Sequence, residues 1–134
     1  MLSVEDKITE FLKSEVFAVV GVSNKPDKFG YKVFKCYQHR GYQVIPIHPV
    51  AKDIDGVACV VNVAELPSEV VSLSVVTPPA VTEKIVISAA QKGIRNIWMQ
   101  PGAQSPSAVA FCEEQGINVI ADGTCALVRF GCKH

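Results

Sequence analysis

Three glycines, each followed within a few residues by an apolar, β-branched run, constrain the fold of this chain more than any other feature. The segments read GYQVI from Gly41, GIRNI from Gly93 and GINVI from Gly116. Glycine readily adopts the left-handed conformation that ends many helices. Each segment therefore predicts a helix that ends at a glycine and hands over to a strand, as in parallel sheets with crossover helices.

Five runs have the composition of short strands. They are rich in β-branched residues, and most lack polar alternation, which is expected where helices cover both faces of a parallel sheet. The runs are FAVVGV (17–22), YQVIPI (42–47), VVSLSVV (70–76), NIWM (96–99) and INVI (117–120). They predict an α/β fold, Rossmann-like and doubly wound, with a mainly parallel sheet of about five strands in an order such as 3-2-1-4-5.

Helix starts and one ambiguous segment complete this outline. Ser3 is placed to cap a first helix, and Ser105 before Pro106 offers an N-cap followed by proline at the first helical position. The segment 51–67 is ambiguous and accommodates a short edge strand at 57–61. A length of 134 residues suits one continuous core, so we expect a single domain spanning 1–134.

Composition narrows the classes of function. The formal net charge is zero and 19% of residues are charged, which argues against a nucleic-acid-binding protein. The five cysteines are odd in number and widely spread, which favours reduced thiols over a disulfide framework or a zinc site. No apolar run approaches the roughly 20 residues that span a bilayer. We therefore expect a soluble, cytoplasmic protein with neither membrane nor nucleic-acid partners.

The stretch after the first predicted strand holds the one marked excess of positive charge. Five basic residues and only one acidic residue, Asp27, lie between positions 25 and 40. The basic residues are Lys25, Lys28, Lys32, Lys35 and Arg40. Gly21 would let a ligand approach the backbone, and a helix beginning near Gly30 would direct its free N–H groups at a phosphate. For Lys32, Lys35 and Arg40 the alternative is a solvated helix face.

The phosphate ligand predicted here differs from NAD. A dinucleotide site needs three closely spaced glycines and an acidic residue after the second strand, and this chain has neither. The second strand instead ends at His48 and Pro49, with Lys52 close by, which suits a ligand that carries a phosphate on its ribose. His48 alternatively forms only a hydrogen bond within its loop.

Taken together, several motifs resemble small CoA-binding proteins related to the nucleotide-binding domain of the succinyl-CoA synthetase α subunit. The resemblance covers roughly residues 5–125. It is carried by VVGVS-x-x-P-x-K-x-G-Y, GYxVIPIHP, the I-x-G and ELP elements at 54–56 and 65–67, VVTPP and IWMQPGAQS. The chain departs from the family at His48, where asparagine is usual, and at Asp122-Gly123-Thr124-Cys125, where the family has Asp-Arg-Cys.

The resemblance implies where coenzyme A would lie. It places the diphosphate over the first turn with help from Lys28 and Tyr31, and the adenosine near the ends of the second and third strands. Gln100, at the end of a later strand, is a further candidate contact. With the charged residues named above, the candidate cofactor-binding residues are Gly21, Val22, Ser23, Lys25, Lys28, Gly30, Tyr31, His48, Pro49, Lys52, Val76, Thr77, Pro78 and Gln100.

Candidates for catalysis are few, and we assign no catalytic or metal-binding residue. Ser23 lacks a nucleophile elbow and is better suited to bind phosphate or cap a helix. The leading hypothesis is therefore a non-catalytic CoA or acyl-CoA binding protein that acts as a carrier, sensor or regulatory module. The alternative is a Rossmann-fold enzyme or enzyme subunit, for CoA-dependent acyl transfer or thiol redox through Cys125 or for NAD(P)-linked oxidoreduction. A partner protein and a homo-oligomer both stay open.

Overall fold

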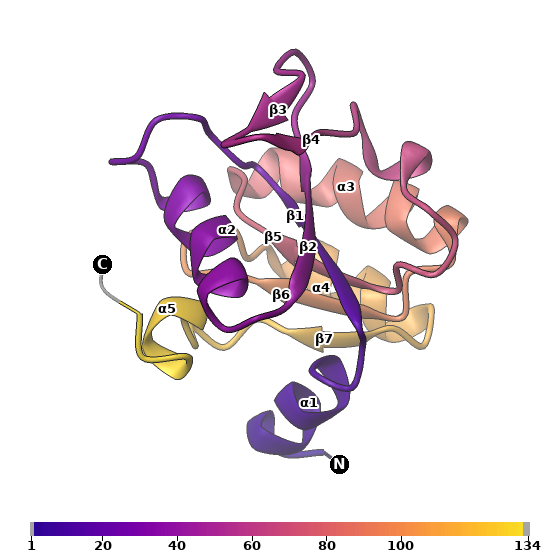
Figure 1. Cartoon of the computed structure of the whole chain (residues 1–134). Coiled ribbons are helices and arrows are strands. Elements are labelled where there is room, and N and C mark those ends of the chain that lie inside the picture. The colour runs from indigo at the N-terminus through magenta and orange to yellow at the C-terminus, as the bar shows by residue number, and fades with distance from the viewer. Residues whose placement is uncertain (1, 133–134) are drawn as a thin grey trace.

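A parallel sheet of five strands runs through the centre of the protein, for which a computed structural model describes residues 2–132 (Figure 1). The strands are β1 (Val16–Val20), β2 (Gln43–Ile47), β5 (Ser72–Val75), β6 (Asn96–Met99) and β7 (Asn118–Ile120). Their order across the sheet is β2-β1-β5-β6-β7, and every neighbouring pair is parallel. The predicted α/β, Rossmann-like architecture is confirmed.

Helices cover both faces of this sheet. They are α1 (Val4–Phe11), α2 (Phe29–His39), α3 (Pro79–Lys92), α4 (Pro106–Glu114) and α5 (Ala126–Arg129). Alternate residues of β1 belong to two separate buried clusters, one shared with α3 and α4 and the other with α1, α2 and α5. This double coverage explains why all five residues of β1 are apolar and buried. No helix within residues 2–132 is long and apolar enough to cross a membrane.

The segment 51–67 contains a hairpin, and the short edge strand predicted at 57–61 is present only as a single bridge. β3 (Asp53–Ile54) and β4 (Val57–Ala58) pair antiparallel in a sheet of their own, and a short 3-10 helix, η1 (Val63–Glu65), follows. Val60 alone reaches the main sheet, through one parallel bridge to Ile47 at the outer edge of β2. The predicted order 3-2-1-4-5 is therefore wrong for the five long strands, which follow 2-1-3-4-5, because the third long run crosses to the other side of β1.

The predicted helix boundaries are present. Gly41, Gly93 and Gly116 all have positive φ at or just after a helix end. Ser3 caps α1 by accepting a hydrogen bond from the Asp6 N–H, and Ser105 caps α4 in the same way. Local sequence signals therefore set most of the element boundaries on both faces.

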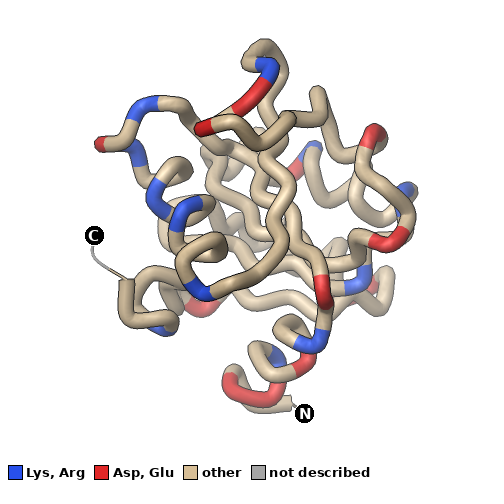
Figure 2. The backbone as a smooth tube through the Cα atoms, viewed as in Figure 1, with Lys and Arg blue, Asp and Glu red and all other residues tan. Residues whose placement is uncertain are grey.

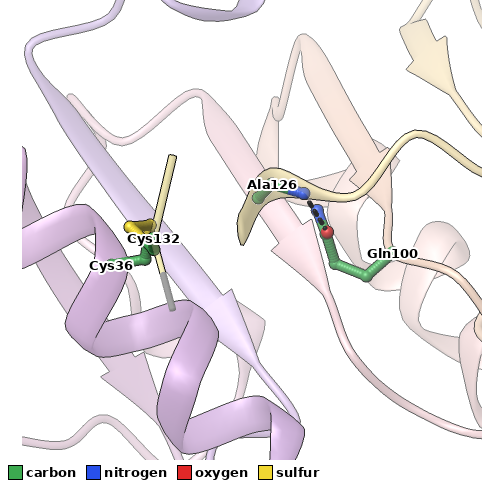
Figure 3. Close-up of a disulfide and its surroundings, with 4 residues drawn as sticks. All are labelled: Cys36, Gln100, Ala126 and Cys132. Carbon is green, nitrogen blue, oxygen red and sulfur yellow. Dashed lines mark hydrogen bonds between the residues drawn. A yellow bond between two sulfur atoms is a disulfide. The ribbon is translucent and has the colours of Figure 1, made fainter. Parts of the chain in front are cut away.

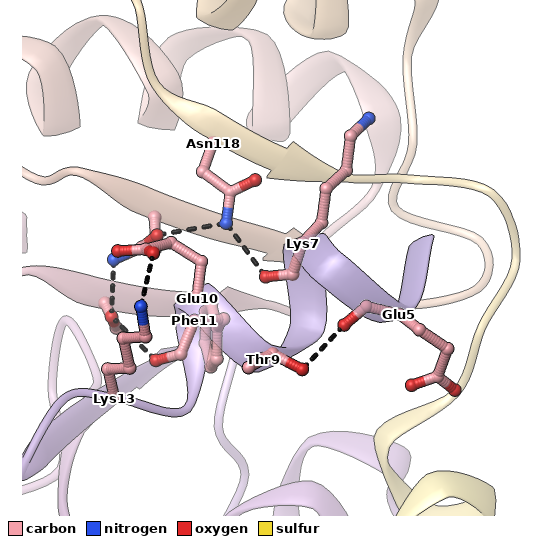
Figure 4. Close-up of polar contacts among 9 residues, drawn as sticks. Glu5, Lys7, Thr9, Glu10, Phe11, Lys13 and Asn118 are labelled. Carbon is pink, nitrogen blue, oxygen red and sulfur yellow. Dashed lines mark hydrogen bonds and ion pairs between the residues drawn. The ribbon is translucent and has the colours of Figure 1, made fainter. Parts of the chain in front are cut away.

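Helix α1 is fixed beneath the amino-terminal ends of the last two strands (Figure 4). The side-chain amide of Asn118 donates to the carbonyl oxygen of Lys7 at 2.9 Å and to Asn96 Oδ1 at 3.0 Å. Ile8 and Phe11 of the same helix are buried against the sheet. Helix α1 is thus anchored to the amino-terminal ends of β6 and β7 by hydrogen bonds and by apolar packing.

Two cysteines that we expected to be reduced form a disulfide (Figure 3). Cys36 in α2 is bonded to Cys132 beyond α5, with Cα atoms 6.0 Å apart and a separation of 96 positions in the sequence. Phe130 packs beside them against the rings of Tyr37 and Trp98. The expectation failed because the pairing depends on α5 folding back onto α2, which no local spacing indicates. Three cysteines stay free, at positions 59, 112 and 125.

Candidate functional site

A pocket of about 450 Å³ lies where the carboxyl ends of β1, β2 and β5 meet. Its volume falls within the roughly 300–1,000 Å³ common for small-molecule sites. The chain leaves β1 toward β2 on one side, whereas β5 flanks β1 on the other side, so this is the switch point at which open α/β sheets bind ligands. The fold therefore places the pocket where a nucleotide is expected.

The pocket gathers candidate residues from three separate stretches of the sequence. Those that line it are Gly21, Val22, His48, Pro49, Val76, Thr77 and Pro78. The remaining candidates, which do not line it, are Ser23, Lys25, Lys28, Gly30, Tyr31, Lys52 and Gln100. The turns after β1, β2 and β5 are thus brought together as predicted, whereas the role of each residue toward a ligand stays a prediction.

Gly21 and Gly30 are required by close packing between backbones. A Cβ atom added at Gly21 would lie within van der Waals overlap of the Val76 carbonyl oxygen, and one added at Gly30 would overlap the carbonyl oxygen of Gly21. Gly21 also has a φ of +91°, which side chains disfavour. From the sequence we expected Gly21 to allow a ligand to approach the backbone. In the structure, its missing side chain allows the turn after β1 to pack directly against the turn after β5.

The amino end of α2 lies beside the pocket, because Gly30 packs against the carbonyl oxygen of the pocket residue Gly21, and the loop 23–28 just before it carries two lysines. Lys28 is the N-cap residue of α2 but makes no capping hydrogen bond with its side chain. The first N–H groups of a helix lack intrahelical partners, and its amino end carries a partial positive charge. Lys25 and Lys28 are both exposed in this loop. Figure 2 shows basic positions, in blue, grouped along this loop and α2. The arrangement suits an anion that lies across the start of α2.

His48 is held by its own loop and also faces the pocket. Its Nδ1 accepts hydrogen bonds from the N–H groups of Val50 at 3.0 Å and Ala51 at 2.8 Å. The hydrogen bonding within its own loop that we considered for His48 is therefore present. Because Nδ1 is an acceptor, a neutral ring carries its proton on Nε2, which leaves that nitrogen as a donor. His48 can thus shape the turn and present one donor at the same time.

Tyr31 contacts an aspartate of the hairpin. Its hydroxyl donates to Asp55 Oδ2 at 2.6 Å, and Lys35 Nζ lies 3.1 Å from the same oxygen. The hydrogen bond from Tyr31, followed by that from Lys35, lowers the pKa of Asp55, while the carboxylate raises the pKa of Tyr31. This cluster ties the hairpin of β3 and β4 to α2, a link that the sequence did not reveal.

Lys52 and Gln100 lie farther from the pocket. Lys52 is exposed on the segment that leads into β3. Gln100 is fully buried, and its Oε1 accepts a hydrogen bond from the Ala126 N–H at 2.8 Å, which positions the start of α5 (Figure 3). Gln100 thus has a structural contact, and its contact with a ligand stays a prediction.

An apolar wall completes the pocket, and sequence reasoning missed it. Val61 and Val63 follow the edge segment, while Val81 and Ile85 project from the first turns of α3. Val61 and Val81 keep 57% and 42% of their surface exposed, so both present apolar surface to the pocket. Val61 and Val63 lie in a short irregular segment, which carries no periodic signal.

The lining holds little that could perform chemistry. His48 is the only ionisable side chain among the lining residues, and the hydroxyl of Thr77 is hydrogen-bonded to that of Thr82 at 2.7 Å. The free thiol of Cys125 is half-buried and lies outside this lining. Burial raises the pKa of the Cys112 thiol to about 11, which keeps it protonated. These features fit the binding of an anionic, partly apolar molecule.

Comparison with known proteins agrees with this geometry. The sequence matches the family of CoA-binding domains over residues 15–130. It is 32% identical over 88 residues to the α subunit of the ADP-forming acetate–CoA ligase II of Pyrococcus furiosus, an alignment that covers 65% of this chain and 19% of the subunit. The chain therefore spans about a fifth of that relative's length.

Two further relatives match along most of their length. An uncharacterised protein of Bacillus subtilis, YneT, is 31% identical over 121 residues, which is 87% of either chain. A solved structure of a conserved hypothetical protein from Pyrococcus furiosus superimposes with a TM-score of 0.82 at 33% identity and covers 86% of this chain and 98% of its own. With the pocket at the switch point and a family match across nearly the whole sheet, the chain belongs to the CoA-binding domain family.

Proposed function

We propose that this protein binds coenzyme A or acyl-CoA without catalysing a reaction on it, as a carrier, sensor or regulatory module. The observation that carries the proposal is the juxtaposition of an apolar pocket with the amino end of α2. The apolar pocket suits an adenosine, and the amino end of α2 suits a diphosphate. Membership of the CoA-binding domain family supports this ligand over other nucleotides.

In this arrangement the adenosine lies against the apolar wall of Val61, Val81 and Ile85. The diphosphate crosses the loop after β1, where Lys28 and the first N–H groups of α2 neutralise its charge. His48 and Lys52 face the ribose and its 3′-phosphate. The absence of a nucleophile paired with a base among the lining residues favours binding over turnover.

Calorimetry with coenzyme A, 3′-dephospho-CoA and NAD tests the proposal. We expect coenzyme A to bind most tightly, dephospho-CoA more weakly and NAD least. A chain that binds no coenzyme A at millimolar concentration would refute the function. Equal affinity for dephospho-CoA would refute only the placement of the 3′-phosphate near His48 and Lys52.

A second candidate function is favoured by the similarity to a ligase α subunit. In this case the chain binds coenzyme A and needs a partner protein to complete an active site. Purification from its own host would reveal a stoichiometric partner, and the complex would form acyl-CoA when supplied with an acid, coenzyme A and a nucleoside triphosphate, which is cleaved to the diphosphate and phosphate. A chain that purifies alone and binds coenzyme A favours the carrier or sensor role.

A further inference from the structure

A second pocket, of about 420 Å³, lies on the side of α2 that faces the chain beyond α5. Its lining residues are Tyr31, Lys32, Lys35, Cys36, His39, Arg40, Phe130, Gly131 and Cys132. The disulfide of Cys36 and Cys132 therefore forms part of its wall. Apart from Tyr31, which is also a candidate contact of the diphosphate, none of these residues takes part in the proposed binding of coenzyme A.

The charge around the disulfide is predominantly positive. Lys32, Lys35, His39 and Arg40 are all basic, and the lining contains no acidic side chain. Asp55 reaches the rim and pairs with Lys35 at 3.1 Å. Within residues 2–132, neither Lys32 nor Arg40 takes part in an ion pair. The pocket is thus a cationic site with a reducible bond in its wall.

The two sulfur atoms differ in accessibility. Cys36 is 1% exposed within α2, whereas Cys132 is half-buried at the edge of the pocket. An incoming thiolate therefore reaches Cys132 first. Basic side chains near a cysteine stabilise its thiolate, so Lys32 and Arg40, one helical turn on either side of Cys36, favour its departure from the bond.

We propose that this pocket is a thiol–disulfide exchange site for anionic thiols of low molecular mass. The thiolate of the small molecule attacks Sγ of Cys132, the bond between the two cysteines breaks, and its electron pair leaves on Cys36. A second molecule of thiol then attacks the sulfur of the first within the mixed disulfide and releases Cys132. Two thiols are oxidised to one small disulfide, and the protein disulfide takes up two electrons and two protons.

Rates of reduction with thiols of different charge test this proposal on the whole chain. The probes are 2-mercaptoethanesulfonate (anionic), 2-mercaptoethanol (neutral) and cysteamine (cationic), and alkylation followed by mass spectrometry reports the reduced cysteines. Each rate is divided by that of the same thiol with a neutral small disulfide, which removes differences in intrinsic reactivity. We expect the anionic thiol to gain about tenfold over the neutral one, because a cleft of one charge concentrates its counter-ion. The cationic thiol should be slowest.

Charge variants locate the effect. Lys32→Gln and Arg40→Gln should each reduce the advantage of the anionic thiol, whereas Lys84→Gln, on exposed α3, should not. Salt near 1 M should abolish the advantage in the wild type, because it screens the pocket. Equal normalised rates for the three probes at low salt would overturn the proposal even if a variant fails to fold. The proposal would also be overturned if all five cysteines of the purified chain were alkylated without a reductant, because the disulfide would then be absent.

Two larger thiols, glutathione and coenzyme A, distinguish the sources of an anionic thiol, and the faster of them after normalisation identifies the better substrate. Adenosine 3′,5′-bisphosphate, which has no thiol, separates this site from the nucleotide pocket. It should leave the rate with 2-mercaptoethanesulfonate unchanged whether or not the protein binds coenzyme A. A fall greater than that caused by inorganic phosphate at the same ionic strength would place the reaction in the nucleotide pocket and refute the assignment to α2 and Cys132.

Discussion

The two ends of helix α2 make different kinds of site. At its amino end, the backbone of a tight turn and an apolar wall form a pocket at the edge of the sheet. Along its carboxyl-terminal half, basic side chains surround a disulfide to a segment 96 residues away. The first is built into the fold by close backbone contacts, whereas the second depends on side chains and one covalent bond. We therefore expect changes at one end to leave the other largely intact.

The largest effect should follow from Gly21→Ala. The added methyl group collides with the Val76 carbonyl and requires a left-handed backbone, costs of about 1–3 and 1–2 kcal/mol respectively. We expect the free energy of unfolding in urea to fall by about 2–5 kcal/mol and binding of coenzyme A to be lost.

Gly93→Ala is the matched control for this change. Gly93 has a similar φ, +93°, but open space around its Cβ position. It should lose only the backbone cost of about 1–2 kcal/mol. Equal losses for the two variants would show that the close contact at Gly21 does not hold the turn together.

Reduction of the disulfide should have the next largest effect. A bond that closes so long a loop restricts the unfolded chain, and its removal commonly costs about 2–4 kcal/mol. The double variant Cys36→Ser/Cys132→Ser should unfold at correspondingly lower urea than the oxidised protein. Its affinity for coenzyme A should change less than about twofold; a larger change would mean that the two ends of α2 are coupled.

Lys28→Gln should weaken the binding of coenzyme A without affecting stability. The side chain is exposed and makes no capping bond, so its contribution is that of one solvent-screened charge, about 0.2–1 kcal/mol or up to fivefold in affinity. Titrations at two salt concentrations should show a smaller salt dependence for the variant. Lys84→Gln provides a surface control, and an equal loss in both variants would argue against a specific phosphate contact.

The smallest effect concerns Asp55. Tyr31 and Lys35 stabilise its carboxylate, so its pKa lies below the usual value, and any stability it contributes is present above the unfolded-state pKa and lost as pH falls through the folded-state value. In Tyr31→Phe, NMR titration should show the pKa of Asp55 rising. The pKa of Asp122, lowered mainly by its hydrogen bond with Thr124, should not move. An unchanged Asp55 would mean that the contact with Tyr31 does not persist in solution.

Features encoded locally were predictable from the sequence. Gly41, Gly93 and Gly116 marked the helix ends, and the continuous apolar runs marked strands covered on both faces. The turns after β1, β2 and β5 were correctly placed at one edge because parallel strands end on the same side. These signals come from short stretches of sequence, so they can be recognised without knowing which distant segments pack together.

Features that depend on distant contacts were not predictable. The predicted strand order was wrong because the third long strand, β5, pairs with β1 on the side away from β2, and no local sequence signal shows on which side a strand will lie. The segment around Val60, where a short edge strand was predicted, makes only one bridge to the main sheet. The pairing of Cys36 with Cys132 needs the end of the chain to return to α2. The contact of Tyr31 with Asp55 joins two loops, and the wall of Val61 and Val81 has no periodic pattern.

A crystal structure of the protein with coenzyme A tests the central claim most directly. We predict that the adenosine lies in the pocket between His48 and Val81, and that the diphosphate lies within hydrogen-bonding distance of the first N–H groups of α2. A pocket that stays empty at saturating coenzyme A, or a ligand bound elsewhere with its diphosphate away from α2, would contradict it.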